Sequence, residues 1–246
     1  TPPTHGAATI HPVTGLWTYT PGANYFGPDA FQVLVTDDLQ GITPAVLHMT
    51  VNPVDDPAII TGNFNATINE DGVATGDLNA SDVEGLTDGT YFTVLTNATH
   101  GAATIHPQSG NWTYTPSANY FGPDAFQVKV TDDLQGITTA VLHMTVNPVD
   151  DPAIITGDFN ATINEDGIAT GDLNASDIEG LTDGTYFTVL TPPTHGAATI
   201  HPQSGNWTYT PSANYFGPDA FQVLVTDDLQ GITPAVLHMT INPVDD

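Results

Sequence analysis

The stretch AFQVKVTDD, residues 125–133, alternates apolar and polar side chains in a chain of 246 residues. Phe126, Val128 and Val130 occupy every second position of it. Because successive side chains of a β-strand point to opposite faces, this pattern predicts a strand with one buried face. The other two copies of the stretch have leucine at the position of Lys129. A lysine is easily accommodated there if the position faces water.

Similar alternation recurs in the neighbouring segments. TAVLHMTV (139–146) and NWTYTP (111–116) alternate in the same way, and NFNATINEDG, TYFTVLT and GAATIHP predict further short strands. Glycine, proline, asparagine and aspartate separate these runs, and no stretch carries apolar residues at helical spacing. Roughly seven short strands in about 95 residues predict an all-β chain of immunoglobulin-like antiparallel β-sandwich modules arranged end to end.

The sequence is an internal repeat. HGAATIHP begins at His5, His100 and His195, so the copies are spaced 95 residues apart. A period of this length fits one small domain and is too long for a solenoid turn. We predict a C-terminal half-module at 1–56 and complete modules at 57–151 and 152–246. A permuted frame, in which the half-module comes last, is also compatible with the sequence.

The charge of the chain is strongly one-sided. It carries 28 acids and a single base, Lys129, for a formal net charge of −27. Such a field repels nucleic acid and anionic lipid, so we expect neither as a partner and no insertion into a membrane. Hydrophobic residues make up 39% and aromatic residues 9%, which indicates a packed core rather than disorder. There is no cysteine, no signal peptide is visible, and we expect an excerpt from a longer protein.

Acidic side chains gather in turn-like strings. The middle repeat contains INEDG, ASDVEG, FGPDAF, VTDDLQG and NPVDDP. A single aspartate in such a context is more often a turn former. Five acidic clusters with almost no base, however, leave repulsion that bound cations would offset, and Ca²⁺ accepts 6–8 oxygen ligands in irregular geometry. TVNPVDDPAIITG recurs at 50–62 and 145–157, which predicts a cation shared at each module boundary.

The order of these strings resembles a known family. ED, ASDxEG, GxWxYTPxxNYFGxDxF and VNPVDDP follow one another as in the VCBS or tandem-95 repeats, the cadherin-like modules of giant RTX-type bacterial surface adhesins. The resemblance covers the whole repeat and implies a cadherin-like fold with Ca²⁺ bound between successive modules. VNPVDDPA is similar to the cadherin linker Asp-x-Asn-Asp-x-x-Pro, but with Asp-Asp in place of Asn-Asp. FGPDAF stands where cadherins have an Asp-Arg-Glu loop and carries one acid instead of two.

The resemblance implies three groups of calcium ligands, residue by residue. The junction near 52–58 would use Asp29, Asp55, Asp56, Asp82, Glu84 and Asp132. The junction near 147–153 would use Glu70, Asp124, Asp150, Asp151, Asp177, Glu179 and Asp227. Half of a third site would consist of Glu165, Asp219, Asp245 and Asp246. Extracellular modules of this kind bind Ca²⁺ at about 10⁻⁴–10⁻³ M.

Other chemistry has little support in the sequence. His100 and His106 would lie roughly 20 Å apart along an extended strand and cannot share one metal ion. Trp112 and Tyr114 are more typical of a sandwich core than of a sugar-stacking platform. The chain has no G-x-S-x-G, H-E-x-x-H or P-loop motif, and no cysteine nucleophile. We therefore expect no enzyme.

The function predicted from the sequence is that of an extender. Modules rigidified by Ca²⁺ would hold an adhesive tip away from a bacterial cell surface, with neighbouring repeats of the same chain as partners. Two alternatives remain open. One is a filament or matrix protein in which modules of like chains pack laterally. The other is a module that itself binds a surface glycan or a like chain.

Overall fold

The computed structural model describes residues 1–182 and 184–245, and within them every regular element is a β-strand. In this part of the chain, no helix has the length and apolar character needed to span a bilayer. The chain divides into two compact units. One consists of residues 1–68, 73–116 and 123–145, and the other of residues 69–72, 117–122 and 146–246. The module boundaries expected from the repeat remain a prediction.

The first unit holds nearly all of strands β1 to β12. Their bounds are β1 Gly6–Ile10, β2 Trp17–Pro21, β3 Gly27–Thr36, β4 Ile42–Val51, β5 Ile59–Gly62, β6 Asn65–Asn69, β7 Ala74–Ser81, β8 Phe92–Thr96, β9 Gly101–Ile105, β10 Asn111–Pro116, β11 Gly122–Thr131 and β12 Ile137–Asn147. Two four-stranded sheets have the orders β5-β7-β10-β9 and β6-β12-β11-β8, and β1-β2 and β3-β4 form two-stranded sheets.

One core joins the two four-stranded sheets. Leu78 and Trp112 come from one sheet and Phe126 and Leu142 from the other, and each is at most 1% exposed. The indole of Trp112 packs directly over Gly76, where any side chain would collide with the ring. The alternating residues of the sequence are therefore the inner face of a sandwich, as predicted.

The paired strands of residues 1–51 have one open face. Trp17 on β2 is 48% exposed and Val35 on β3 is 62% exposed, whereas the equivalent Trp112 and Val130 are 1% and 0% exposed. In the middle repeat, strands β5 to β8 supply the rest of the two sheets. The first copy has no equivalent of these strands among the described residues, which accounts for the exposure of Trp17 and Val35.

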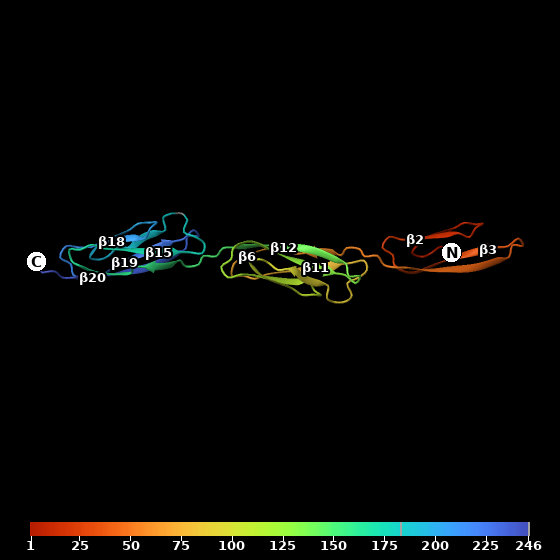
Figure 1. Cartoon of the computed structure of the whole chain (residues 1–246), viewed down its shortest axis with the longest axis horizontal. Coiled ribbons are helices and arrows are strands. Elements are labelled where there is room, and N and C mark those ends of the chain that lie inside the picture. Colours follow the sequence, from red (N-terminus) through yellow and green to blue (C-terminus); the bar gives the residue numbers. More distant parts are fainter. Residues whose placement is uncertain (183, 246) are drawn as a thin grey trace. The chain divides into compact units, whose positions relative to one another are not determined.

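The second unit repeats this architecture in strands β13 to β20. Their bounds are β13 Ile154–Gly157, β14 Asn160–Asn164, β15 Ala169–Ser176, β16 Phe187–Thr191, β17 Gly196–Ile200, β18 Asn206–Pro211, β19 Gly217–Thr226 and β20 Ile232–Asn242. The sheet orders are β13-β15-β18-β17 and β14-β20-β19-β16, and Figure 1 labels β15 and β18 of the first and β19 and β20 of the second. The core includes Leu173, Trp207, Phe221 and Leu237 from both sheets.

The predicted fold class is confirmed: the chain is all-β, with tandem immunoglobulin- and cadherin-like sandwiches. A complete repeat has eight strands rather than about seven, and one pair, β14 and β20, is parallel. The reason lies at Gly157, whose φ of 121° lets the chain pass from β13 in one sheet to β14 in the other. A side chain at Gly157 would meet the backbone of Asp172 and Leu173.

Candidate metal sites

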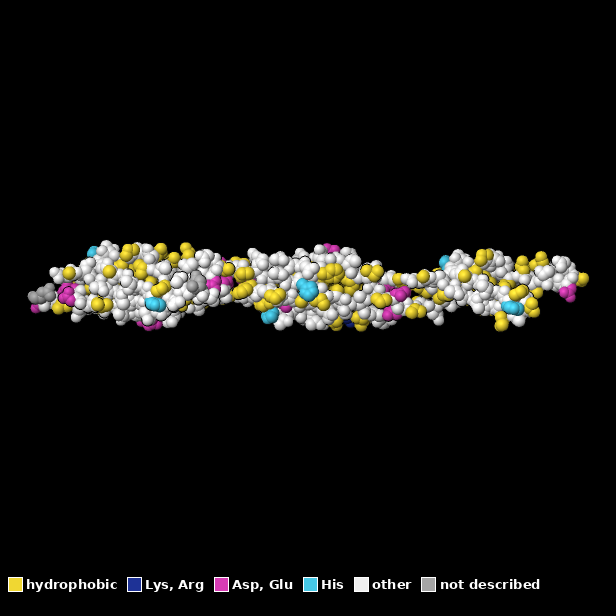
Figure 2. All heavy atoms as spheres, turned by 90° about the horizontal axis from the view of Figure 1, so that it is seen from above, with side chains coloured by type: hydrophobic (Ala, Val, Ile, Leu, Met, Phe, Trp, Pro, Cys, Tyr) yellow, Lys and Arg dark blue, Asp and Glu magenta, His cyan; other side chains and the backbone are white. Residues whose placement is uncertain are grey.

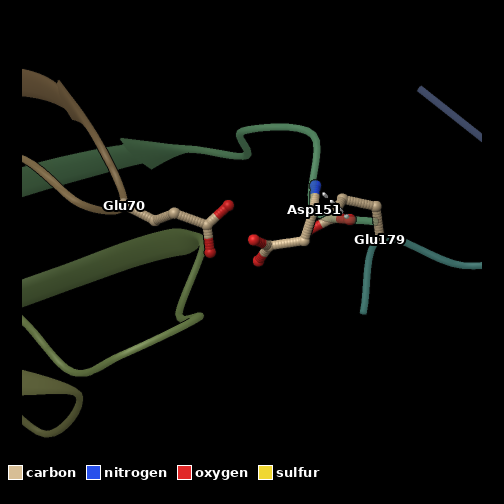
Figure 3. A group of neighbouring side chains, drawn as sticks. All are labelled: Glu70, Asp151 and Glu179. Carbon is tan, nitrogen blue, oxygen red and sulfur yellow. Dashed lines mark hydrogen bonds between the residues drawn. The ribbon is translucent and has the colours of Figure 1, made fainter. Parts of the chain in front are cut away.

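Three acids from separate parts of the sequence meet in the second unit. Glu70 follows β6, Asp151 lies in the segment between β12 and β13, and Glu179 follows β15. One oxygen of each carboxylate lies within 4.8 Å of the other two. Figure 3 shows the carboxylates of Glu70 and Asp151 pointing toward each other. This arrangement offers several oxygen ligands to one cation.

Hydrogen bonds fix these three side chains and leave specific oxygens free. The Val149 amide donates to Glu70 Oε1 at 2.6 Å, and the Asp151 amide donates to Glu179 Oε2 at 3.3 Å. The Asn119 side chain donates to Asp151 Oδ2 at 3.2 Å. Glu70 Oε2 and Glu179 Oε1 are buried and have no hydrogen-bond partner. Burying a carboxylate oxygen without a donor costs free energy, so a bound cation would stabilise both oxygens.

A second group of acids lies in the same unit. A methyl group on Gly231 would collide with the carboxylates of both Asp150 and Asp227, so those two carboxylates approach each other closely. Burial and then the charge of Asp227 raise the pKa of Asp150, and Asp177 and Asp151 add to the rise. Asp227 is 1% exposed, and Asp177 has a buried Oδ2 without a partner. Like charges are therefore concentrated here as well.

The first unit contains an equivalent arrangement around residues 55 and 56. The Asp56 amide donates to Glu84 Oε2 at 3.2 Å, and Asp82 has a buried Oδ2 without a partner. A methyl group on Gly136 would collide with both Asp55 and Asp132. Burial and then the charge of Asp132 raise the pKa of Asp55. Burial also raises the pKa of Glu84. The hydrogen bond from the Asp56 amide lowers this pKa, and the nearby Asp82 raises it.

The structure gives three of the predicted ligands a different environment. Thr99 and Ala125 donate backbone amides to Asp124 Oδ1 at 3.0 and 2.9 Å. The His100 amide and the Tyr114 hydroxyl each donate to Asp124 Oδ2 at 2.9 Å. Both oxygens of this carboxylate already have donors within the first unit, and its hydrogen bonds are those of a structural residue.

Asp29 and Asp219 have the same kind of environment. Asp29 accepts hydrogen bonds from the backbone of Thr4, His5 and Ala30 and from Tyr19. Burial alone would raise its pKa, but these donors together lower it to about 2. The pKa of Asp219 is lowered for the same reason.

The last predicted group is only partly described. Glu165 is 6% exposed, and its Oε1 accepts the Val244 amide at 2.7 Å, as Glu70 accepts Val149. Asp245 is exposed, and Asp246 lies outside the described residues. Three residues of the sites were not anticipated from the sequence: Asn119, Gly136 and Gly231. Asn119 has a φ of 59°, and its place in SANYFG gives a turn signal but no sign of its contact with Asp151.

The acids are grouped rather than spread evenly. On the face shown in Figure 2, acidic side chains form small separate groups among uncharged ones. Lys129 is the one lysine or arginine of the sequence, so lysine and arginine side chains cannot neutralise these groups. The sites present only oxygen donors, which suit hard cations such as Ca²⁺.

Comparison with known proteins identifies related sequences and folds. A family model described as a bacterial Ig domain matches residues 1–50, 55–145 and 150–240. None of the curated proteins matches the chain. The extracellular domain of protocadherin gamma B4 is similar in structure, with a TM-score of 0.62 and 12% identity over 98% of this chain and 42% of that one.

Two further solved structures have the same fold. Protocadherin gamma B2 extracellular cadherin domains 1–5 give a TM-score of 0.60 and 10% identity, over 97% of this chain and 50% of that one. Mouse cadherin-23 EC22–24 gives 0.53 and 11%, over 88% of this chain and 74% of that one. The chain thus spans half or less of the two protocadherin structures, and at these identities the likeness concerns the fold alone.

Proposed function

Because the chain belongs to the bacterial Ig domain family, we propose that it is a set of non-catalytic extender repeats whose module junctions are stiffened by bound Ca²⁺. Tandem immunoglobulin- and cadherin-like repeats of this kind suggest an extracellular module of the extender or adhesion type. The finer proposal is that the repeats belong to a large RTX-type adhesin on a bacterial surface and hold its adhesive tip away from the cell.

One observation carries the proposal: buried carboxylate oxygens without a hydrogen-bond partner belong to residues of the ligand groups predicted from the sequence. They are Glu70 Oε2, Asp82 Oδ2, Asp177 Oδ2 and Glu179 Oε1. All four belong to the ligand groups that the cadherin resemblance implies. Buried polar atoms are nearly always paired in folded proteins, so four unpaired oxygens in these two places point to a missing positive partner.

The donor set favours calcium over other metals. Every candidate ligand is a carboxylate, and neither cysteine nor histidine belongs to the three-acid cluster. Ca²⁺ takes oxygen ligands in flexible geometry, whereas Mg²⁺ demands a near-ideal octahedron and holds its water tightly. A bound ion would hold together the segments that carry its ligands. Without it, mutual repulsion of the acids would loosen the same segments.

The partners that follow from this role are further repeats of the same chain. The acidic surface argues against nucleic acid and anionic lipid. A filament with lateral packing would need contacts between chains, and a glycan-binding module would need an exposed aromatic platform. Trp112 and Tyr114 are buried at 1% and 0% exposure, so the middle repeat does not offer these two rings to a sugar.

Calcium titration and solution scattering of the whole chain test the proposal. We expect calorimetric binding at about 10⁻⁴–10⁻³ M, a higher melting temperature in Ca²⁺, and a smaller maximum dimension after chelation. Mg²⁺ at the same ionic strength serves as the control for general screening of charge. If Ca²⁺ produces no binding heat and changes neither quantity, the junctions are not calcium sites.

A further inference from the structure

The second unit contains a parallel strand pair that joins the beginning and the end of one sandwich. Residues Asn160 to Asn164 of β14 pair with His238 to Asn242 of β20. One further hydrogen bond extends the pair at each end. The His238 amide donates to Phe159 O at 2.8 Å, and the Glu165 amide donates to Asn242 O at 3.0 Å. Tension applied at the two ends of this sandwich would shear these bonds together rather than open them one at a time.

The preceding copy shows the same end contacts. The His143 amide donates to Phe64 O at 2.8 Å, and the Glu70 amide donates to Asn147 O at 3.0 Å. Strands β6 and β12 are neighbours in their sheet. Glu70 is thus the last residue of this contact, directly beside the point where the chain leaves β12.

The Glu70 side chain extends the contact by one further bond. Its Oε1 accepts the Val149 amide at 2.6 Å, two residues beyond the end of β12. Its Oε2 is buried, has no partner, and points toward Asp151 in the three-acid cluster (Figure 3). One carboxylate that is 3% exposed therefore faces the outgoing backbone with one oxygen and the candidate cation site with the other.

We propose that Glu70 is a positioning residue that couples cation binding to the attachment of the segment after β12. This inference rests on the calcium site of the proposed function and adds a mechanical role to it. An ion on Oε2 fixes the carboxylate, and the fixed carboxylate holds the Val149 amide through Oε1. The coupling is reciprocal, because an ordered Val149 contact also presents Oε2 to the ion.

The consequence is directional. An ion at this cluster locks the exit end of the sandwich that contains Glu70, at the end of the β6–β12 contact. Glu165 makes the equivalent bond to Val244 at 2.7 Å, at the exit end of the next sandwich. A cation beside Glu70 would strengthen the sandwich that precedes it against tension.

Amide hydrogen exchange of the full chain, followed by NMR with and without CaCl₂, tests the coupling. At a Ca²⁺ concentration ten times the dissociation constant, we expect exchange at Val149 to slow about tenfold. In Glu70→Gln the amide oxygen still accepts the Val149 bond, so exchange without Ca²⁺ stays near that of the unaltered chain, but most of the slowing by Ca²⁺ is lost. In Glu70→Ala exchange is faster in both conditions. Glu165→Gln is the matched control and leaves Val149 unchanged.

The outcomes separate the two proposals. Calcium binding by calorimetry without slower exchange at Val149 overturns the coupling and leaves the calcium site standing. Equal slowing in Glu70→Gln and in the unaltered chain also overturns it. Absence of any calcium binding overturns the proposed function, and the coupling with it. Slowing that Glu70→Gln removes and Glu165→Gln preserves supports the coupling, because loss of a merely structural hydrogen bond would not depend on Ca²⁺.

Discussion

At the scale of single residues, the buried acids differ in the donors that surround them. Asp124 has four donors from its own sandwich, and both of its oxygens are paired. Glu70 receives one amide and keeps a second buried oxygen without a partner. The same chemical group is therefore a structural acceptor in one place and a candidate ligand in the other. The difference arises from the hydrogen-bond donors within reach and not from the carboxylate itself.

The structural acid gives a prediction for Tyr114→Phe. The variant removes the hydroxyl that donates to Asp124 Oδ2 at 2.9 Å and keeps the buried ring. Because this bond goes to a buried charged group, we expect the free energy of unfolding to fall by about 1.5–3 kcal/mol. Urea unfolding measures the change.

The exposed hydroxyl of Thr113 provides the comparison for this variant. It pairs with Thr104 at 2.7 Å on the outer face of the sheet, and Thr113→Ala should change the free energy of unfolding by about 0.5 kcal/mol or less. Equal effects of the two variants would contradict a special role for the Tyr114–Asp124 bond.

The glycines beside the acid pairs give a second prediction. A methyl group in Gly136→Ala would occupy the space between Asp55 and Asp132, so one carboxylate must move. We expect Ca²⁺ affinity at that junction to fall about tenfold or more, as it does when groups around a metal site are displaced. In the matched variant Gly41→Ala, the nearest atoms all belong to Asp37. Calorimetry should show weaker binding for Gly136→Ala alone, and an equal loss in both variants would refute the assignment.

At the scale of strands, the sequence predicts best where bulky residues alternate. β11 is the clearest case, because Phe126, Val128 and Val130 are all at most 1% exposed. β7 was not predicted, since Leu78 is its only bulky inner residue and the other inner positions carry alanine and glycine, which leave room for a large neighbour. Gly76 lies under the Trp112 ring, so the apolar group that fills this position belongs to another strand. A pattern of side chains along one strand cannot report such a contact.

The different exposures of the three tryptophans give a further prediction. Trp17 is 48% exposed, whereas Trp112 and Trp207 are each 1% exposed. In variants that keep a single tryptophan, with phenylalanine at the other two positions, acrylamide should quench Trp17 severalfold more strongly. Trp112 and Trp207 should behave alike and emit at shorter wavelength. Quenching of Trp17 as weak as that of Trp112 would show that something covers the face of β2.

At the scale of the whole molecule, the period of 95 residues predicts where acids recur but not which of them meet. The acids of NPVDDP and ASDVEG lie close together, as the Asp56 amide shows by donating to Glu84, and they belong to the segments that follow β4 and β7. Asp124 also stands in an acid-containing string, FGPDAF, yet its carboxylate turns toward amides of its own sandwich. The sequence of such a motif predicts that the segment is negatively charged. The direction in which each carboxylate points depends on strand register, which only the folded chain fixes.

Acidification should change the free energy of unfolding in opposite directions with and without Ca²⁺. Burial and a neighbouring charge raise the pKa of Asp55 and Asp150, and burial raises that of Glu179 despite the Asp151 amide. Such groups bind protons more readily in the folded chain than in the unfolded chain. Without Ca²⁺, the free energy of unfolding should therefore fall as pH rises from the ordinary carboxyl range, about pH 4, through the raised values. With Ca²⁺, protons compete with the ion, and acidification through the same window should reduce stability.

Thermal melts in chelator and in saturating Ca²⁺ measure the two slopes. Asp29, with its pKa near 2, works in the other direction: its contribution is complete above the ordinary carboxyl value and is lost as pH falls toward the lowered one. Both conditions should therefore share a loss of stability below about pH 4. Asp55→Asn with Asp150→Asn is the control for the net charge of −27, and it should flatten the slope in chelator. Parallel slopes with and without Ca²⁺ would mean that protons act on the overall charge and not on these junctions.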